Sequence, residues 1–270
     1  MELIINSIDH LTKKPKPQKI ISTVPSITEL LCDLNLEDQL IGVTKFCEYP
    51  LHIKKTKPII GGTKKLKLDF IDELQPDLII ANKEENTQEE ILQLAEKFPV
   101  YLTDIKTLED NNQMILNLGK LCFKNSEARN IVDKINYAQK DFQSFIKDYP
   151  IVKVAYFIWA RPWMAAGNNT FINHMLEING FENMYANHER YPQIMIKKFR
   201  MEGDAKVVLL PNEPYPFKDE DAFELGRFTH HAKTLFVDGT YFSWYGSRIT
   251  KAFSYFKQVR KSLDKPEYDL

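Results

Sequence analysis

Aromatic side chains gather at the points where predicted β-strands end, and they are the residues best suited to bind a ligand. All three tryptophans, Trp159, Trp163 and Trp244, lie in the second half of the chain. In the first half, Phe46 and Tyr49 follow a predicted strand in the same way. Aromatic faces suit the burial of a large planar or amphipathic ligand. The sequence therefore predicts a ligand cleft, although each ring taken singly is also typical of a residue that covers a core edge.

Three arginines accompany these rings and are candidates for the acidic groups of a ligand: Arg161, Arg190 and Arg248. A guanidinium group binds carboxylates and phosphates through parallel hydrogen bonds. In open α/β sheets, ligands bind outside the carboxyl ends of the strands. That rule adds two segments to the predicted binding region, the turn at Pro25 and Ser26 and the segment Lys45–Pro50.

Motifs for catalysis, nucleotide binding or metal binding do not stand out in the sequence. Residues 61–64 read GGTK and lack the P-loop and dinucleotide patterns, so they predict a turn. The six histidines lack metal-ligand spacing, and no serine lies in a G-x-S-x-G elbow. We therefore expect a binding protein that is not an enzyme and has neither a covalent cofactor nor a metal site. The alternative is a cytoplasmic enzyme, with His188 and Glu189 beside Tyr191 as its candidate groups.

Composition limits the classes of partner. The chain has 270 residues, 43% of them hydrophobic, enough for one large domain or two smaller lobes. Its formal net charge is -1, from 36 basic and 37 acidic residues, which gives no electrostatic case for a nucleic acid or a membrane surface. We expect a monomer that binds a small molecule. Cys32, Cys47 and Cys122 are odd in number and far apart, so a disulfide framework is not expected.

The start of the chain bears on its compartment. The first residues lack the basic segment, apolar stretch and small-residue cleavage site of a signal peptide. If Met1 is the native start, we expect a cytoplasmic protein. If a leader has been removed, we expect a periplasmic one.

Short apolar runs alternate with segments of helical spacing along the first half, a pattern typical of a parallel α/β sheet. Ser26 with Glu29, and Thr87 with Glu90, stand in the S/T-x-x-E arrangement of a capping box, which predicts two helix starts. The predicted strands of this half are residues 20–24, 40–43, 78–81 and 100–103, and further helices are predicted over residues 68–74 and 108–123.

The middle of the chain predicts one long helix. Residues 126–146 contain neither glycine nor proline, and apolar residues recur there at spacings of four and three. The α/β pattern then restarts, with predicted strands at residues 152–159, 207–210 and 235–237 and a last helix from Ser247. We therefore predict an α/β fold of two Rossmann-like lobes joined by one long rigid α-helix, with a ligand cleft between the lobes. The predicted domains are residues 1–124, the connecting helix 125–149, and residues 150–270.

Several segments, taken in order, resemble the class III, or helical-backbone, substrate-binding proteins of ABC importers. The resemblance runs from about Lys19 to Val259. The segments that show this resemblance are IISTVPSITELL, LIGVTKFCEYP, GGT followed by LDFIDELQPDLIIA, the long helix, AAGNNTFINHMLEINGFENMY and VDGTYFSWYGSRI. It implies capture of a corrinoid (cobalamin-like) ligand, or another metal chelate such as haem or a ferric siderophore, for ABC-type uptake.

The cobalamin-binding members of that family look closest, and the resemblance assigns roles to individual residues. Phe46 falls where those members place a tyrosine beside the corrin, and Tyr191 falls at a cleft tryptophan. Trp159 or Trp163 would supply a ring from the second lobe, whereas Thr63 stands where those members have a tryptophan. The full set of predicted ligand-binding residues is Pro25, Ser26, Phe46, Thr63, Trp159, Arg161, Trp163, Tyr191, Thr240, Trp244, Tyr245 and Arg248.

The resemblance also implies docking on an ABC permease, which in this family uses an acidic residue on each lobe. Asp69 matches the first of these. Lys197 and Lys198 lie where the second carboxylate is expected, and Glu202 comes later in the chain. Paired charges steer association, so the missing carboxylate bears on whether a permease is engaged. Three alternatives stay open: an importer subunit with a leader, the chelate-processing enzyme, and a scaffold that has lost its ligand.

Overall fold

The computed structural model describes residues 8–203, 205–229 and 231–263, and these divide into two compact units. Unit 1 comprises the described residues up to Asn136 together with Tyr245–Thr250. Unit 2 comprises Tyr137–Trp244 and the described residues from Lys251 onward. The predicted two-lobe α/β fold is confirmed, and each unit contains its own sheet.

Unit 1 is built on a sheet of four parallel strands in the order β2-β1-β3-β4. All four predicted strands of the first half are present. Their bounds are β1 Ile20–Ser22, β2 Leu40–Gly42, β3 Leu78–Asn82 and β4 Val100–Thr103. Strand β3 is buried along its whole length, as expected for a central parallel strand covered on both faces.

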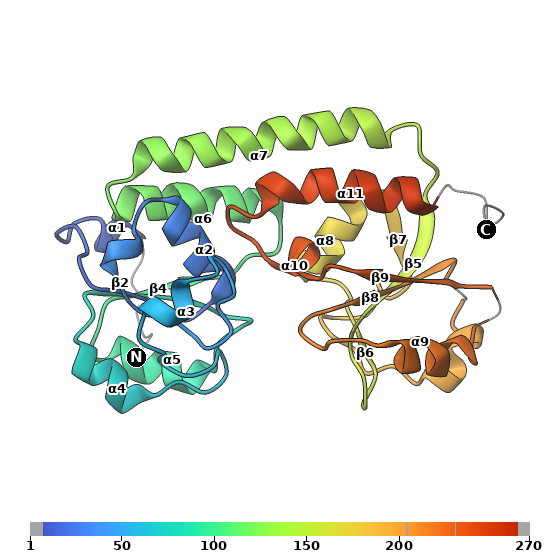
Figure 1. The fold of residues 1–270 in the computed structure, drawn as a ribbon, viewed down its shortest axis with the longest axis horizontal. Coiled ribbons are helices and arrows are strands. Elements are labelled where there is room, and N and C mark those ends of the chain that lie inside the picture. The colour runs from blue at the N-terminus through green and yellow to red at the C-terminus, as the bar shows by residue number, and fades with distance from the viewer. Residues whose placement is uncertain (1–7, 204, 230, 264–270) are drawn as a thin grey trace. The chain divides into compact units, whose positions relative to one another are not determined.

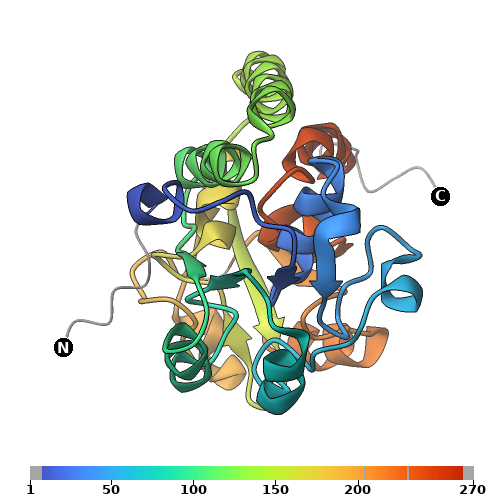
Figure 2. The ribbon, with the colours of Figure 1, turned by 90° about the vertical axis from the view of Figure 1, so that its left-hand side faces the viewer.

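Helices cover both faces of this sheet (Figure 1, Figure 2). Helices α4 and α5 pack on one face, where Ile71, Ile91 and Leu94 meet the β3 residues Ile79 and Ala81 in one buried cluster. Helices α2 and α6 lie on the opposite side (Figure 1). The elements between the strands are α2 Pro25–Asp33, η1 Glu37–Gln39, α3 Ile53–Thr56, α4 Leu68–Leu74, α5 Gln88–Ala95 and α6 Leu108–Leu121, and α1 Ile8–Leu11 comes before them.

The two predicted capping boxes are wrong, although both helices form. Helix α2 begins at Pro25 with Val24 as its N-cap, and no side chain caps it. Helix α5 has Thr87 as its N-cap, but the Thr87 hydroxyl donates to the carbonyl of Lys64 instead. The capping box is found at α6, where Thr107 and Asp110 each accept a hydrogen bond from the other's backbone amide. A distant backbone carbonyl thus takes the Thr87 hydroxyl away from α5, whereas α2 begins one residue before Ser26, which therefore cannot cap it.

The predicted long helix is present as α7, Asn125–Ile146, which is 22 residues long and therefore about 33 Å at the standard rise. It passes from unit 1 to unit 2 after Asn136. Its apolar face is buried at Ile131, Ile135 and Phe142, three of the positions that the sequence spacing predicts. In unit 2, Phe142 packs on the rings of Phe253 and Phe256.

Unit 2 repeats the same strand order in its own sheet. Strands β7, β5, β8 and β9 are parallel neighbours in that order, and β6 pairs antiparallel with the end of β5. Sequence periodicity predicts three of these strands but not β6 or β7, which are only two and three residues long. The bounds are β5 Val152–Trp159, β6 Met164–Ala165, β7 Phe181–Asn183, β8 Val207–Pro211 and β9 Lys233–Val237.

Helices again lie on both sides of the sheet of unit 2 (Figure 1). One face carries the buried cluster that joins Phe157 and Val208 to Phe199 on η2 and Leu225 on α9. The helices of this unit are α8 Phe171–Ile178, η2 Ile196–Met201, α9 Asp219–Gly226, α10 Thr240–Ser243 and α11 Ile249–Leu263. Across the described ranges, every helix is too short or too polar to span a bilayer.

Candidate ligand-binding site

In unit 1, the carboxyl end of β2 presents an exposed aromatic ring. Phe46 is 50% exposed and the ammonium of Lys45 lies 5.0 Å from the centre of its ring. Gly62 allows this ring to sit against the turn at residues 61–63, because a Cβ on Gly62 would lie 3.1 Å from Phe46 Cε2. Pro25 and Ser26 form the first turn of α2 and are buried.

A buried polar network fixes the turns at the carboxyl end of this sheet. Asn86 is its hub: its side-chain oxygen accepts from the Thr23 hydroxyl (2.7 Å) and from the amide of Asn82 (2.9 Å). Its side-chain nitrogen donates to the carbonyl of Thr63 (2.9 Å). Thr63 is itself almost fully buried, so its backbone is held in place by the loop after β3.

The predicted ligand residue Arg248 is buried and binds a carboxylate of its own unit. Its guanidinium donates to Glu29 through two hydrogen bonds, from Nε to Oε2 (2.8 Å) and from Nη2 to Oε1 (3.0 Å). Arg248 and Glu29 are 5% and 7% exposed. The ring of Tyr49 lies 3.9 Å from Arg248 Cζ, and the neighbouring predicted residue Tyr245 is buried as well. The structure thus brings Arg248 to the base of the loop that carries Phe46. The polar edge of the Arg248 guanidinium is already bound to Glu29.

In unit 2, the carboxyl end of β5 presents a second exposed ring. Trp159 is 42% exposed and meets Tyr215 edge-on, with 5.3 Å between ring centres. Trp163, by contrast, is buried and stacks on Phe217 at 5.7 Å. Of the two tryptophans that the sequence offered for this lobe, Trp159 therefore presents the accessible face.

Arg161 is engaged by carboxylates in unit 2 much as Arg248 is in unit 1. It donates to Asp221 (2.8 Å), to Glu224 (2.9 Å) and to the hydroxyl of Tyr215 (3.1 Å). The hydrogen bond to Asp221 raises the pKa of the Arg161 guanidinium above its ordinary value. Arg161 has a φ of 61°, a left-handed conformation that is unusual for a residue with a side chain. Its ion pairs hold the β5–β6 turn against α9.

Among the remaining predicted residues of unit 2, Trp244 is held by Glu213, which follows β8. Trp244 Nε1 and Ser243 Oγ donate to the two carboxylate oxygens of Glu213, at 2.9 and 2.5 Å. Thr240 is buried and donates from its hydroxyl to Asp238 (2.7 Å), whereas Tyr191 is half-buried. Beneath them, burial raises the pKa of the Tyr156 hydroxyl well above its ordinary value.

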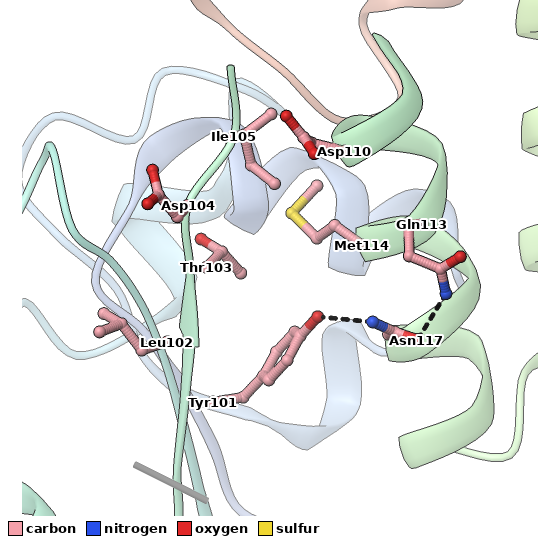
Figure 3. Close-up of a pocket in the computed structure, with 9 residues that line it drawn as sticks. All are labelled: Tyr101, Leu102, Thr103, Asp104, Ile105, Asp110, Gln113, Met114 and Asn117. Atoms are coloured by element: carbon pink, nitrogen blue, oxygen red, sulfur yellow. Dashed lines mark hydrogen bonds between the residues drawn. The ribbon is translucent and has the colours of Figure 1, made fainter. Parts of the chain in front are cut away.

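Unit 1 also contains two small pockets, each lined by residues outside the predicted set. One, of about 180 Å³, lies between β4 and α6 (Figure 3) and contains a chain of hydrogen bonds from Gln113 to Asn117 to the Tyr101 hydroxyl. The other, of about 250 Å³, lies beside the start of α5. Its lining residues are Asn82, Lys83, Asn86, Gln88, Ile91, Leu92 and Leu102. Both are far smaller than a macrocyclic chelate requires.

The groups considered for catalysis are engaged in structural contacts. Glu189 accepts two hydrogen bonds from the Asn169 side chain, and the His188 ring lies edge-on to Tyr185. Within the described ranges, no three His, Cys, Asp or Glu side chains are grouped so that they could hold a metal ion. Burial raises the pKa of the Cys122 thiol to about 12, so this thiol stays protonated at neutral pH.

The predicted docking residues are accessible on separate units. Asp69 is exposed on α4 of unit 1. Lys197 and Lys198 are exposed on η2 of unit 2. Each would be available to a protein partner.

The family model for periplasmic binding proteins matches residues 20–200 of the chain. The chain belongs to the periplasmic binding protein family. Similar curated proteins include the uncharacterized ABC transporter substrate-binding lipoprotein YvrC of Bacillus subtilis, 27% identical over 196 residues. They also include a vitamin B12-binding protein of Pectobacterium carotovorum, 26% identical over 189 residues. These alignments cover 70% and 66% of this chain, and 62% and 66% of the respective relatives. The chain thus spans slightly less than two-thirds of their length.

Solved periplasmic binding proteins share the fold. The periplasmic vitamin B12 binding protein of Vibrio cholerae aligns with a TM-score of 0.78 at 18% identity, over 93% of this chain and 99% of that one. A periplasmic heme binding protein from Pseudomonas aeruginosa aligns with a TM-score of 0.80 at 21% identity, over 93% and 95%. The named relatives and neighbours are binding proteins, and the resemblance to that family is confirmed.

Several residues that shape these strand ends were not predicted from the sequence. Tyr215 comes four residues after the end of β8, as Phe46 does after β2, so its position after a strand was a signal that could have revealed it. Lys45 lies in the segment that the strand-end rule predicted, but its charge was given no part in ligand binding. Glu29 and Glu213 had no such signal, because their partners lie 219 and about 30 residues away in the chain.

Proposed function

We propose that this protein is a substrate-binding protein that captures a metal chelate and delivers it to an ABC-type importer. The observation that carries the proposal is the pair of accessible rings, Phe46 and Trp159, each at the carboxyl end of a parallel strand in its lobe. Parallel sheets bind ligands at that end. The names of the curated relatives, which bind vitamin B12 or serve ABC transporters, support the same function.

A corrinoid is the first of three proposed ligand classes, ahead of haem and a ferric siderophore. Of the three predicted arginines, Arg161 and Arg248 hold carboxylates of the protein itself, so two of the three polar edges are committed, and the third, Arg190, is exposed. Haem carries two carboxylates that would need cationic partners, whereas the rim of a corrinoid consists mainly of neutral amides. Lys45, beside Phe46, is the cation that we propose for an acidic group of the ligand.

The proposed partner is a permease that meets unit 1 at Asp69. The charge on η2 of unit 2 is positive at Lys197 and Lys198, so we propose that the permease surface opposite η2 is acidic. Names of relatives that include "periplasmic" or "lipoprotein" support a location outside the cytoplasmic membrane.

Absorbance titration tests the proposed function directly. The purified protein is titrated with cyanocobalamin, with haemin and with a ferric hydroxamate siderophore, and quenching of tryptophan emission is followed in parallel. We expect a dissociation constant in the micromolar range or below for cyanocobalamin. Phe46→Ala and Trp159→Ala should each weaken binding by about tenfold, because each removes a large apolar contact with the ligand.

Tyr137→Ala is the matched control, since Tyr137 is a 77% exposed aromatic residue on α7, away from the strand ends. Its affinity should equal that of the unmodified protein. A protein that binds none of the three chelates, or variants at Phe46 and Trp159 that bind as well as the control, would contradict the proposal.

A further inference from the structure

The loop that follows β2 is attached to helix α2 at two points. At the first, the Cys47 thiol donates to the Thr28 hydroxyl (3.2 Å). At the second, the Tyr49 ring packs on Arg248, and Arg248 binds Glu29. Thr28 and Glu29 are adjacent on α2, so both attachments end on the same turn of one helix. The first depends on residues close in sequence, whereas the second depends on a residue near the other end of the chain.

We propose that Arg248 is a positioning residue that fixes the loop of residues 44–50, and that the Tyr49 ring it holds is a further contact for the ligand. The ligand part of this inference rests on the proposed function. The edge of the guanidinium is bound to the Glu29 carboxylate, and its face is covered by Tyr49. Arg248 therefore acts on a ligand through the loop.

The chemistry of the guanidinium suits it to this task. A planar, delocalised cation can bind a carboxylate with two parallel hydrogen bonds while an aromatic ring covers its face. A lysine ammonium is a point charge without a face to stack on. The pair is buried, so the carboxylate keeps the guanidinium in one orientation, and that orientation sets where Tyr49 can lie.

The segment that carries Arg248 is itself fixed within unit 1. The amide of Gly246 donates to the side chain of Asn111 on α6, which is fully buried. Gly246 has a φ of 99°, and a Cβ there would lie 3.2 Å from the carbonyl oxygen of Ser26. The close approach to α2 therefore depends on glycine at this position. Arg248 thus projects from a fixed segment towards the loop.

Hydrogen–deuterium exchange of the ligand-free protein tests the positioning role without any ligand. Arg248→Lys keeps the positive charge but loses the stacked face. In this variant we expect amides in the peptide of residues 44–53 to exchange at least tenfold faster, including those of Cys47 and Ile53, which donate to Thr44 and Pro50. Exchange in β3 should not change.

Arg260→Lys is the matched control. Arg260 is only 1% exposed and lies over the rings of Tyr149 and Phe181 in unit 2. The Arg260→Lys substitution should lower the free energy of unfolding without changing amide exchange in residues 44–53. If Arg248→Lys does not fold, the double variant Glu29→Gln with Arg248→Met removes both charges and should give the same faster exchange. Unchanged exchange in residues 44–53 would overturn the proposal.

A double-mutant cycle with cyanocobalamin then tests the ligand contact. Arg248→Lys and Tyr49→Leu should each weaken binding by about fivefold to tenfold, and the double variant should be no weaker than Tyr49→Leu alone within about twofold, because both act through one ring. Fully additive losses would overturn the role of Tyr49. If the unmodified protein binds none of the chelates while exchange still rises in Arg248→Lys, the proposed function fails and the positioning role stands.

Discussion

Arg248 and Arg161 both form ion pairs with carboxylates, but the two pairs differ in their exposure to solvent. Arg248 and its partner Glu29 are both buried, whereas the side chain of Arg161 is 56% exposed. A buried ion pair costs desolvation energy, and removing one member leaves the other charge without compensation. An exposed pair is screened by water and contributes little. The consequence of losing a partner is therefore expected to be far greater at Glu29.

Replacing Glu29 by alanine should lower the free energy of unfolding by about 3–5 kcal/mol, because the Arg248 guanidinium would remain buried without a counter-ion. The double variant Glu29→Gln with Arg248→Met should lose less than this single variant. Urea unfolding followed by circular dichroism measures the difference. As a control, Asp104→Ala breaks the exposed pair with Lys83 and should cost under about 1 kcal/mol. Equal losses in Glu29→Ala and Asp104→Ala would contradict this assignment.

The buried thiol of Cys122 should make the stability of the protein depend on pH in the alkaline range. Burial raises its pKa from 9.0 to about 12, so above pH 9 the unfolded chain loses the proton that the folded chain keeps. The contribution of this thiol to the free energy of unfolding is fully present below pH 9 and is lost as the pH rises towards 12. Between about pH 8 and pH 10, the unmodified protein should lose about 1 kcal/mol more free energy of unfolding than Cys122→Ala. Parallel pH profiles of the two proteins would show that Cys122 is not protected from solvent.

At the scale of helices and strands, periodicity was a good guide and capping motifs were not. Apolar runs predicted the strands β1 to β4, β5, β8 and β9, because a buried parallel strand needs only a continuous apolar stretch. The predicted box at Ser26 and Glu29 failed because α2 begins at Pro25, which places Ser26 inside the helix, and because Glu29 binds Arg248. The box at Thr87 and Glu90 failed because Glu90 accepts from the amide of Leu66. Partners brought by the tertiary fold are invisible to a four-residue motif.

The same limit applies to the candidate site. The sequence placed aromatic residues at strand ends, and Phe46 and Trp159 are accessible there. The sequence could not distinguish these two rings from Trp163, because Trp163 also lies near the end of a predicted strand. In the structure the Trp163 ring is buried against Phe217. Arginine roles were equally hidden, because the carboxylates that bind Arg161 come from a helix about 60 residues away. Which face of a ring or cation is covered depends on packing between distant segments.

The helix that does have a capping box, α6, offers a test at this scale. Thr107→Ala removes the side chain that accepts from the Asp110 amide, and should lower the free energy of unfolding by about 1 kcal/mol. Ser26→Ala should change it by less than about 0.5 kcal/mol, because α2 has no side-chain cap to lose. Chemical denaturation of both variants provides the comparison. A larger loss at Ser26 than at Thr107 would mean that the predicted cap at Ser26 is formed in solution.

At the scale of the whole molecule, each unit carries one of the two accessible rings, Phe46 in unit 1 and Trp159 in unit 2, so the response of each unit to a ligand can be followed by itself. All three tryptophans, Trp159, Trp163 and Trp244, belong to unit 2, so their fluorescence follows the unfolding of that unit alone. Exchange of amides in β1 and β3 follows unit 1. Two observables therefore separate the response of each unit.

Saturation with cyanocobalamin at about 100 times its dissociation constant should raise the free energy of unfolding by about 2.7 kcal/mol. We expect a later fluorescence transition in urea and slower exchange in β1 and β3, because the proposed function assigns a ligand-contacting ring to each unit. α-Ribazole, the nucleoside part of cyanocobalamin without the macrocycle, is the control and should change neither. Protection confined to one unit would show that a single lobe binds the ligand.

The chain enters unit 1 twice, once up to Asn136 and again over Tyr245–Thr250. This second passage supplies the counter-ion of Glu29 and the amide that binds Asn111. A fragment ending at residue 136 would therefore leave the Glu29 carboxylate and the Asn111 side chain without these partners, even though its sheet would be complete. Separating the lobes for biophysical work would require adding residues 245–250 back, either as a short peptide in trans or through a circularly permuted chain.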